Sequence, residues 1–81
     1  DVRSKAEFRT GHLAGAVNIP LWNLSGALNQ LDKSQPLVVY CRSGHRSALA
    51  LRTLRSAGFP KAKHLAGGTG AWSRAGFPLE S

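Results

Sequence analysis

The sequence predicts an α/β protein in which a parallel sheet is flanked by helices. Short apolar segments that contain β-branched residues alternate with patterns of helical period, and glycine and proline separate them. Repeated β-α units of this kind build parallel sheets, because each helix returns the chain to the edge where the next strand begins. A length of 81 residues allows only one modest core. We therefore expect a single domain over residues 1–81.

The first two expected strands are short. Asp1-Val2-Arg3 has too few residues to cross a sheet, so we expect it to be the end of a strand that begins before Asp1. The segment Ala16–Ile19, which precedes Pro20, is predicted as the second strand. Between residues 21 and 31 apolar side chains recur at helical spacing. They predict a helix with one apolar stripe, formed by Leu24, Ala27, Leu28 and Leu31.

The segment Leu37–Tyr40 predicts a strand buried on both faces. It follows Pro36, is wholly apolar and contains two β-branched residues. A helix is expected over Ser47–Ala57, with Gly58 at the position that follows a helix end. One face of that helix carries Ala50, Leu51, Leu54 and Ala57. A strand, a tight loop and a helix are therefore predicted in succession.

The last part of the chain repeats this order. Lys63–Leu65 predicts a short strand, and Gly70–Ala75 predicts a last short helix that carries Trp72. Between them, the glycine-dense segment Gly67–Gly70 predicts a loop with unusual backbone angles, for which a simple turn is the structural alternative.

Charge and composition limit the functions that need to be considered. Eleven Lys and Arg against four Asp and Glu give a net charge of +7, which suits nucleic acid, an anionic membrane or a small anionic substrate. The basic residues are scattered without an aromatic platform, so we expect no nucleic-acid partner. No apolar run approaches the roughly 18 residues of a membrane span, and the first residues lack a signal-peptide core. We expect no membrane contact and a cytoplasmic location, with the periplasm as the alternative.

The single cysteine, Cys41, is either an inert buried thiol or a functional one, since it has no disulfide partner. Cys41 and His45 have ligand-like spacing, but no second Cys/His pair completes a metal site. Cys41 ends a predicted strand and Ser47 opens a predicted helix, so the loop between them must turn sharply at Gly44. Its backbone amides and the helix N-terminus would then face the sulfur and favour a thiolate. Arg42 and Arg46 add positive charge, which also lowers a thiol pKa from about 8.5.

Four segments together resemble the signatures of the rhodanese-like family, and they occur in the family's order. They are Asp1-Val2-Arg3, Glu7-Phe8 with Gly11-His12-Leu13, Gly15–Pro20 and Val38–Ser47. Further on, His64–Gly68 with Trp72, Gly76 and Pro78 is similar to the family's closing segment. The resemblance covers nearly the whole chain. It implies an α/β rhodanese-like domain with a parallel sheet of about four to five strands, and a cysteine that carries sulfur as a persulfide.

The resemblance also implies residue roles. Cys41 would be the nucleophile that takes sulfur from thiosulfate or a similar anionic donor and passes it to cyanide or a thiol, which a protein acceptor could supply. No metal or organic cofactor is needed. The expected substrate-binding residues are Arg42, Ser43, Gly44, His45 and Arg46, with the two arginine side chains gripping the donor and His45 contributing mainly its backbone amide.

Other functions and roles stay open at this point. A non-catalytic sulfur carrier or regulatory module would use the same cysteine, and related phosphatases use a loop one residue longer than Cys41–Arg46. His12 is expected to form hydrogen bonds near the first loop, and His64 to lie at a strand, both with structural roles. We expect an ion pair among Asp1, Arg3 and Glu7 that supports the strand end.

Overall fold

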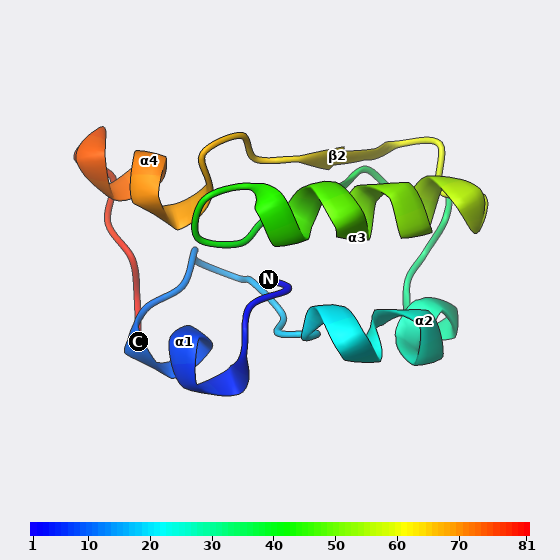
Figure 1. Cartoon of the computed structure of the whole chain (residues 1–81), viewed down its shortest axis with the longest axis horizontal. Helices are drawn as coiled ribbons and strands as arrows, with labels where there is room; N and C mark the ends of the chain where they lie inside the picture. The colour runs from blue at the N-terminus through cyan, green and yellow to red at the C-terminus, as the bar shows by residue number, and fades with distance from the viewer.

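The computed structural model, which describes residues 1–81, contains one sheet of two short parallel strands. Strand β1 (Leu37–Val39) pairs with β2 (Ala62–His64), with Leu37 opposite Ala62 and Val39 opposite His64. Helix α3 (His45–Ser56) connects them as the crossover that parallel pairing requires. In Figure 1, α3 lies between the strand pair and the segment around α2 (Leu24–Ala27). The predicted α/β class with a parallel sheet is confirmed.

Helix α3 follows the predicted pattern closely. Its buried side chains are Ser47, Ala50 and Leu54, and it begins at His45, two residues before the predicted start. Gly58 has φ +89° just beyond the helix end, which is the left-handed conformation that glycine adopts without a steric cost. The apolar stripe of α3 thus faces the strands.

The predicted sheet of four to five strands contains only two regular strands. The other two predicted strands are segments outside the regular ladder that continue the sheet by a few hydrogen bonds, among them one of 2.9 Å from the Asp1 N-terminal amine to the Val17 carbonyl. The Val2 amide donates to Tyr40 at 3.0 Å, and the Ile19 amide donates to Asp1 at 2.9 Å. Because Asp1–Arg3 contributes only three residues to the pairing, these bonds are too few to form a regular ladder.

The expected strand Leu37–Tyr40 is buried on one face rather than both. Val38 is 57% exposed, and its partner Lys63 is exposed as well. Side chains alternate along a strand, so Leu37 and Val39 face α3 while Val38 faces the opposite side. Helices cover the first face only. A hollow of about 240 Å³ is lined by Val38 and by Val17 of the neighbouring extended segment.

The helical stripe between residues 21 and 31 forms three short pieces instead of one helix. They are the 3₁₀ turn η1 (Leu21–Asn23), helix α2 and the 3₁₀ turn η2 (Leu28–Gln30). Asn23, Ser25, Gly26 and Asn29 all have poor helix propensity, which accounts for the interruptions. The predicted apolar stripe is confirmed, because Leu24 and Ala27 are buried and Leu28 and Leu31 pack against the core.

Two terminal helices complete the fold. Helix α1 (Lys5–Thr10) was not predicted, although Ser4 and Glu7 form a capping box whose Ser-x-x-Glu pattern is visible in the sequence. Helix α4 (Gly68–Arg74) begins two residues earlier than predicted, inside the glycine-dense segment. An isolated antiparallel bridge between His12 and Glu80 joins the C-terminal segment to the α1 region. No helix has both the length and the apolar character to cross a membrane.

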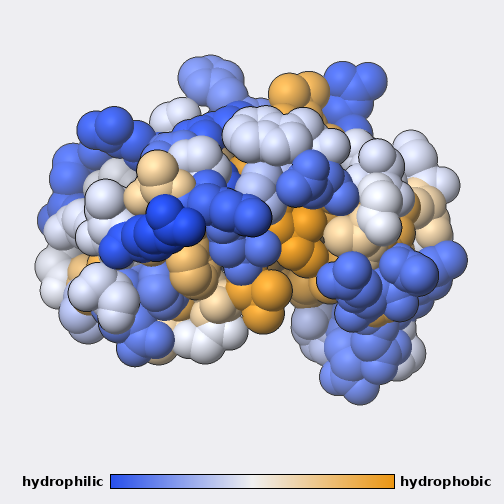
Figure 2. Space-filling view, turned by 90° about the horizontal axis from the view of Figure 1, so that it is seen from below, coloured by the Kyte–Doolittle hydropathy of each residue, from blue (hydrophilic) through white to orange (hydrophobic).

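The hydrophobic core is built by residues between Val2 and Ala62, and α1 and α4 contribute no side chain to it. Its buried members are Val2, Leu24, Val39, Cys41, Ala50, Leu54, Phe59 and Ala62. Apolar groups are not confined to the interior, because Val17 and Trp22 are 70% and 69% exposed. Figure 2 shows apolar atoms gathered near the middle of one face, beside a hollow and between polar residues. Cys41 belongs to the core, at the point where β1 leads into the loop before α3.

Candidate active site

The loop that joins β1 to α3 wraps around the side chain of Cys41. The chain leaves β1 after Val39 and enters α3 at His45. Gly44 has φ +116° and stands immediately before the helix, so the sharp turn predicted at this glycine is present. Cys41 has no exposed surface. The sulfur is therefore enclosed by the loop and by the first turn of α3.

Three hydrogen-bonding groups surround the Cys41 sulfur. The Gly44 amide donates to Sγ at 3.1 Å and the Ser47 amide donates at 3.4 Å. The Ser47 hydroxyl oxygen lies 3.7 Å from Sγ. Amide groups at the start of a helix carry partial positive charge, so this arrangement favours negative charge on the sulfur.

The surroundings of Cys41 change its thiol pKa in two opposing ways. Burial raises the pKa, because it disfavours the charged thiolate. Hydrogen bonds from Ser47, Gly44 and Ser43 lower it, and they outweigh burial, so the pKa lies below the ordinary value for cysteine. This direction agrees with the prediction from sequence. The cause is mainly the amide groups, as expected, together with the Ser47 hydroxyl, and the arginine charges are not among the main causes.

The start of the loop is held by helix α4. The Thr69 amide donates to the carbonyl of Cys41, and the Gly70 amide donates to the carbonyl of Arg42, both at 2.9 Å. Gly68 lies so close that a Cβ atom on it would be 2.1 Å from the Cys41 carbonyl oxygen. The glycine-dense segment thus forms a close backbone contact with the loop, which its composition alone did not show.

The predicted substrate-binding residues occupy different places around the loop. Arg42, Ser43 and His45 are exposed, whereas Gly44 and Arg46 are half-buried. The Ser43 hydroxyl and the His45 ring lie 3.3 Å apart on the outer side of the loop. Gly44 contacts the sulfur through its amide, and the Ser43 amide and the Arg46 side chain also interact with it. The binding roles of these five residues stay a prediction.

Arg46 is engaged by a carboxylate from α1. Its guanidinium donates to both oxygens of Glu7, at 2.6 Å and 2.9 Å. The predicted ion pair among Asp1, Arg3 and Glu7 is only partly correct: Asp1 and Arg3 form a buried pair at 2.6 Å, but Glu7 pairs with Arg46 instead. The pKa of Arg46 is raised by Glu7 first and also by the Cys41 thiolate. The interaction between the two charges is mutual, so the Arg46 guanidinium also favours the Cys41 thiolate, even though it is hydrogen-bonded to Glu7.

We expect Glu7→Gln to lower the stability of the protein at neutral pH by about 1 kcal/mol, because the Glu7–Arg46 pair is one-third exposed and screened by solvent. Arg46 lowers the pKa of Glu7 from 4.5 to about 2. A lowered carboxyl pKa stabilises the fold above pH 4.5, and this contribution is lost as the pH falls toward 2. Urea unfolding of both proteins from pH 7 to pH 2 should therefore show a difference that shrinks with acid. A constant difference would contradict this assignment.

Two residues near the sulfur were missed as site residues. Ser47 was predicted only as the first residue of a helix, yet its amide and hydroxyl both face Sγ. His64 lies in a strand as predicted, although β2 covers Ala62–His64 rather than Lys63–Leu65, and its Nδ1 also lies 3.0 Å from the Ser47 hydroxyl. The position of Ser47 one residue after the loop was an available signal. The contact between His64 and Ser47 joins residues 17 apart in sequence, and no local pattern indicates it. His12 has the expected local role, with Nδ1 2.9 Å from the Phe8 carbonyl.

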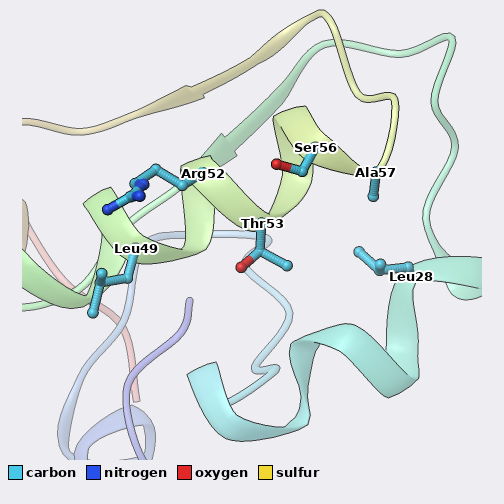
Figure 3. A pocket seen from close by; sticks show the side chains of 6 residues that line it. All are labelled: Leu28, Leu49, Arg52, Thr53, Ser56 and Ala57. Carbon is cyan, nitrogen blue, oxygen red and sulfur yellow. The ribbon is translucent and has the colours of Figure 1, made fainter.

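The largest of the four hollows on the surface is separate from Cys41. It has a volume of about 560 Å³ and is open and shallow, between η2 and the outer side of α3. Figure 3 shows its lining side chains, which are Leu28, Leu49, Arg52, Thr53, Ser56 and Ala57. The set lacks a thiol, an imidazole and a carboxylate. The chemistry of the chain is therefore concentrated at the loop and not in this groove.

The comparisons with known proteins agree on one family. The model of the rhodanese-like domain family matches residues 1–75. Thiosulfate sulfurtransferase 16 of Arabidopsis thaliana is 34% identical, over 100% of this chain and 78% of that protein. The putative sulfur carrier protein YrkF of Bacillus subtilis is also 34% identical, over 90% of this chain and 40% of that protein. A crystal structure of a rhodanese-related protein from Thermoplasma volcanium superposes with a TM-score of 0.93 at 31% identity, covering 99% of this chain and 79% of that one.

Proposed function

This chain belongs to the rhodanese-like domain family, and on that premise we propose that it is a sulfurtransferase that carries sulfane sulfur on Cys41 as a persulfide. The observation that supports this most directly is the buried Cys41 sulfur with two backbone amides donating to it. Thiosulfate or a similar small anion is the proposed donor. Cyanide or a thiol, which a partner protein could present, is the proposed acceptor.

The proposed first step is an attack by the Cys41 thiolate on the outer sulfur of the donor. A new sulfur–sulfur bond forms to Cys41, the donor's own sulfur–sulfur bond breaks, and sulfite leaves with the electron pair of that bond. The lowered pKa of Cys41 supplies the thiolate, which is the nucleophilic form of cysteine. In the second step the acceptor attacks the outer persulfide sulfur and restores the thiolate. The cycle is a ping-pong sequence and balances without an external oxidant or reductant.

The geometry supports a small transferred group rather than a bulky one. Cys41 is enclosed, and the loop that surrounds it is short and held by hydrogen bonds from α4. The amide groups of Gly44 and Ser47 could hold a terminal sulfur anion as they hold the thiolate. Arg42, which is exposed beside the loop, is the cation that remains available to attract an anionic donor.

The proposal is tested by incubating the protein with thiosulfate and measuring its intact and peptide masses. We expect a gain of one sulfur atom, located on the peptide that contains Cys41, and its removal by cyanide with release of thiocyanate. Prior alkylation of Cys41 serves as the control and should prevent the gain. An unchanged mass with thiosulfate and with other sulfane-sulfur donors would refute the persulfide.

A sulfur carrier without independent turnover is the second candidate. It is supported by the similarity to a protein named as a putative sulfur carrier and by the engagement of Arg46 with Glu7, which limits the free positive charge at the loop. A carrier would gain sulfur on Cys41 but form thiocyanate only once per chain. The enzyme would form it repeatedly, so a steady-state thiocyanate assay separates the two.

A further inference from the structure

A chain of polar side chains links the end of β2 to the Cys41 sulfur. His64 Nδ1 lies 3.0 Å from Ser47 Oγ, and Ser47 Oγ lies 3.7 Å from Cys41 Sγ. Cys41 and Ser47 show no exposed surface, and His64 is half-buried. The three residues come from the loop just after β1, the first turn of α3 and the end of β2. Packing of α3 on the strand pair therefore brings them together.

The hydrogen bonds around Ser47 Oγ compete for a single proton. A serine hydroxyl has one donor and two acceptor positions. Three possible acceptors surround it: the Gly44 carbonyl at 3.1 Å, His64 Nδ1 and the Cys41 sulfur. The Gly44 carbonyl already receives the Ala48 amide at 3.0 Å, so it does not depend on Ser47. Whether His64 Nδ1 carries a proton then decides which acceptor receives the Ser47 hydroxyl proton.

If Nδ1 is bare, it accepts the serine proton, and the hydroxyl turns its lone pairs toward the sulfur. A lone pair facing a thiolate is unfavourable, whereas a lone pair facing a thiol can accept its S–H. If Nδ1 carries a proton, it donates to Ser47 Oγ, and the serine proton is free to point at Sγ. Both the neutral Nδ1–H tautomer and the imidazolium can do this.

We propose that His64 is a positioning residue that donates Nδ1–H to Ser47 Oγ and thereby directs the Ser47 hydroxyl proton to the Cys41 thiolate. His64 does not touch the sulfur or a substrate and acts only through Ser47. The inference deepens the proposed function and rests on it, because the Cys41 thiolate matters for turnover only if Cys41 carries the sulfur. Its direct consequence is a property of the resting protein, the stability of the Cys41 thiolate, which is measured without any sulfur transfer.

The test is the pH dependence of iodoacetamide alkylation of Cys41, which gives the apparent thiolate pKa. Hydrogen bonds to charged groups are among the stronger ones, so Ser47→Ala should raise this pKa by about one unit. His64→Leu should raise it by about half a unit. His64→Asn should stay near the wild-type value, because its amide nitrogen can donate from a position close to that of Nδ1. Lys63→Gln is the matched control, since Lys63 is the β2 neighbour on the opposite, exposed face.

The double variant Ser47→Ala/His64→Leu separates a relay from a structural effect. If His64 acts through Ser47, replacing it in the Ser47→Ala background should cause no further pKa change. A shift of equal size in both backgrounds, or no shift in His64→Leu, would overturn the proposal. Loss of sulfur transfer with these pKa relations preserved would count against the proposed function and leave this inference intact.

A second measurement needs no substitution and covers the case in which His64→Leu fails to fold. Long-range ¹H–¹⁵N NMR correlations of the imidazole rings report which nitrogen is protonated. At a pH where Cys41 is ionised, we expect His64 Nδ1 to carry a proton in the wild-type protein. A bare Nδ1 with the proton on Nε2 alone would overturn the proposal.

Discussion

Replacing Cys41 with serine is expected to abolish persulfide formation and to reduce thiocyanate production roughly a thousandfold or more, to assay background. A serine hydroxyl is not ionised near neutral pH, and its oxygen cannot carry sulfane sulfur as a persulfide. The measurement is thiocyanate formation from thiosulfate and cyanide, together with the protein mass after thiosulfate treatment. Wild-type protein should gain sulfur and the variant should not.

The fold of the Cys41→Ser variant should survive, because serine is close to cysteine in size and its oxygen can accept the amide bonds that reach Sγ. Thermal unfolding followed by circular dichroism checks this. Ser56→Ala, at the far end of α3, is the parallel control and should keep wild-type transfer. Sulfur transfer that persists in Cys41→Ser would place the nucleophile elsewhere and refute the assignment.

The parts of the fold that follow from local patterns were predicted well from the sequence. The strand before Cys41 and the helix after it have strong signals, namely a wholly apolar run and an apolar stripe at helical spacing. The number of regular strands was not predictable in this way. Whether Asp1–Arg3 forms a ladder depends on how many hydrogen bonds its neighbours can make, and that is a tertiary property.

The exposure of Val38 shows a similar limit. An apolar strand segment is compatible with burial on one face or on two, and only the position of the surrounding helices decides. Helix α1 is the opposite case. Its capping box, formed by Ser4 and Glu7, is a local sequence pattern, so the sequence carries the signal for this helix.

The candidate site likewise has features that the local sequence predicts and features that depend on tertiary packing. The cysteine, the turn at Gly44 and the lowered thiol pKa followed from the order strand, loop and helix. The pairing of Arg46 with Glu7 joins residues 39 apart, and the contact of Ser47 with His64 joins residues 17 apart. Contacts at such separations depend on how α1 and β2 pack around the loop. A single sequence carries no pattern for them.

Gly68→Ala is expected to destabilise the protein by about 3 kcal/mol and to impair sulfur transfer along with stability. Gly68 has φ +55°, which costs an alanine roughly 1 kcal/mol. The larger effect is steric, because the added Cβ would lie 2.1 Å from the Cys41 carbonyl oxygen and 2.7 Å from the Arg42 carbonyl carbon. These are backbone atoms, so the loop or α4 must shift. Urea unfolding gives the loss of stability.

Gly76→Ala separates the steric effect from the backbone one. Gly76 also has a positive φ, +87°, but nothing lies within 4 Å of an added Cβ. Gly76→Ala should lower the stability by only about 1 kcal/mol and keep wild-type sulfur transfer. The additional loss of stability in Gly68→Ala then measures the contact between α4 and the loop.

We also expect a higher thiolate pKa in Gly68→Ala, because displacing Cys41 moves the sulfur away from the Gly44 and Ser47 amides. Equal losses in the two variants would mean that α4 does not hold the loop in place.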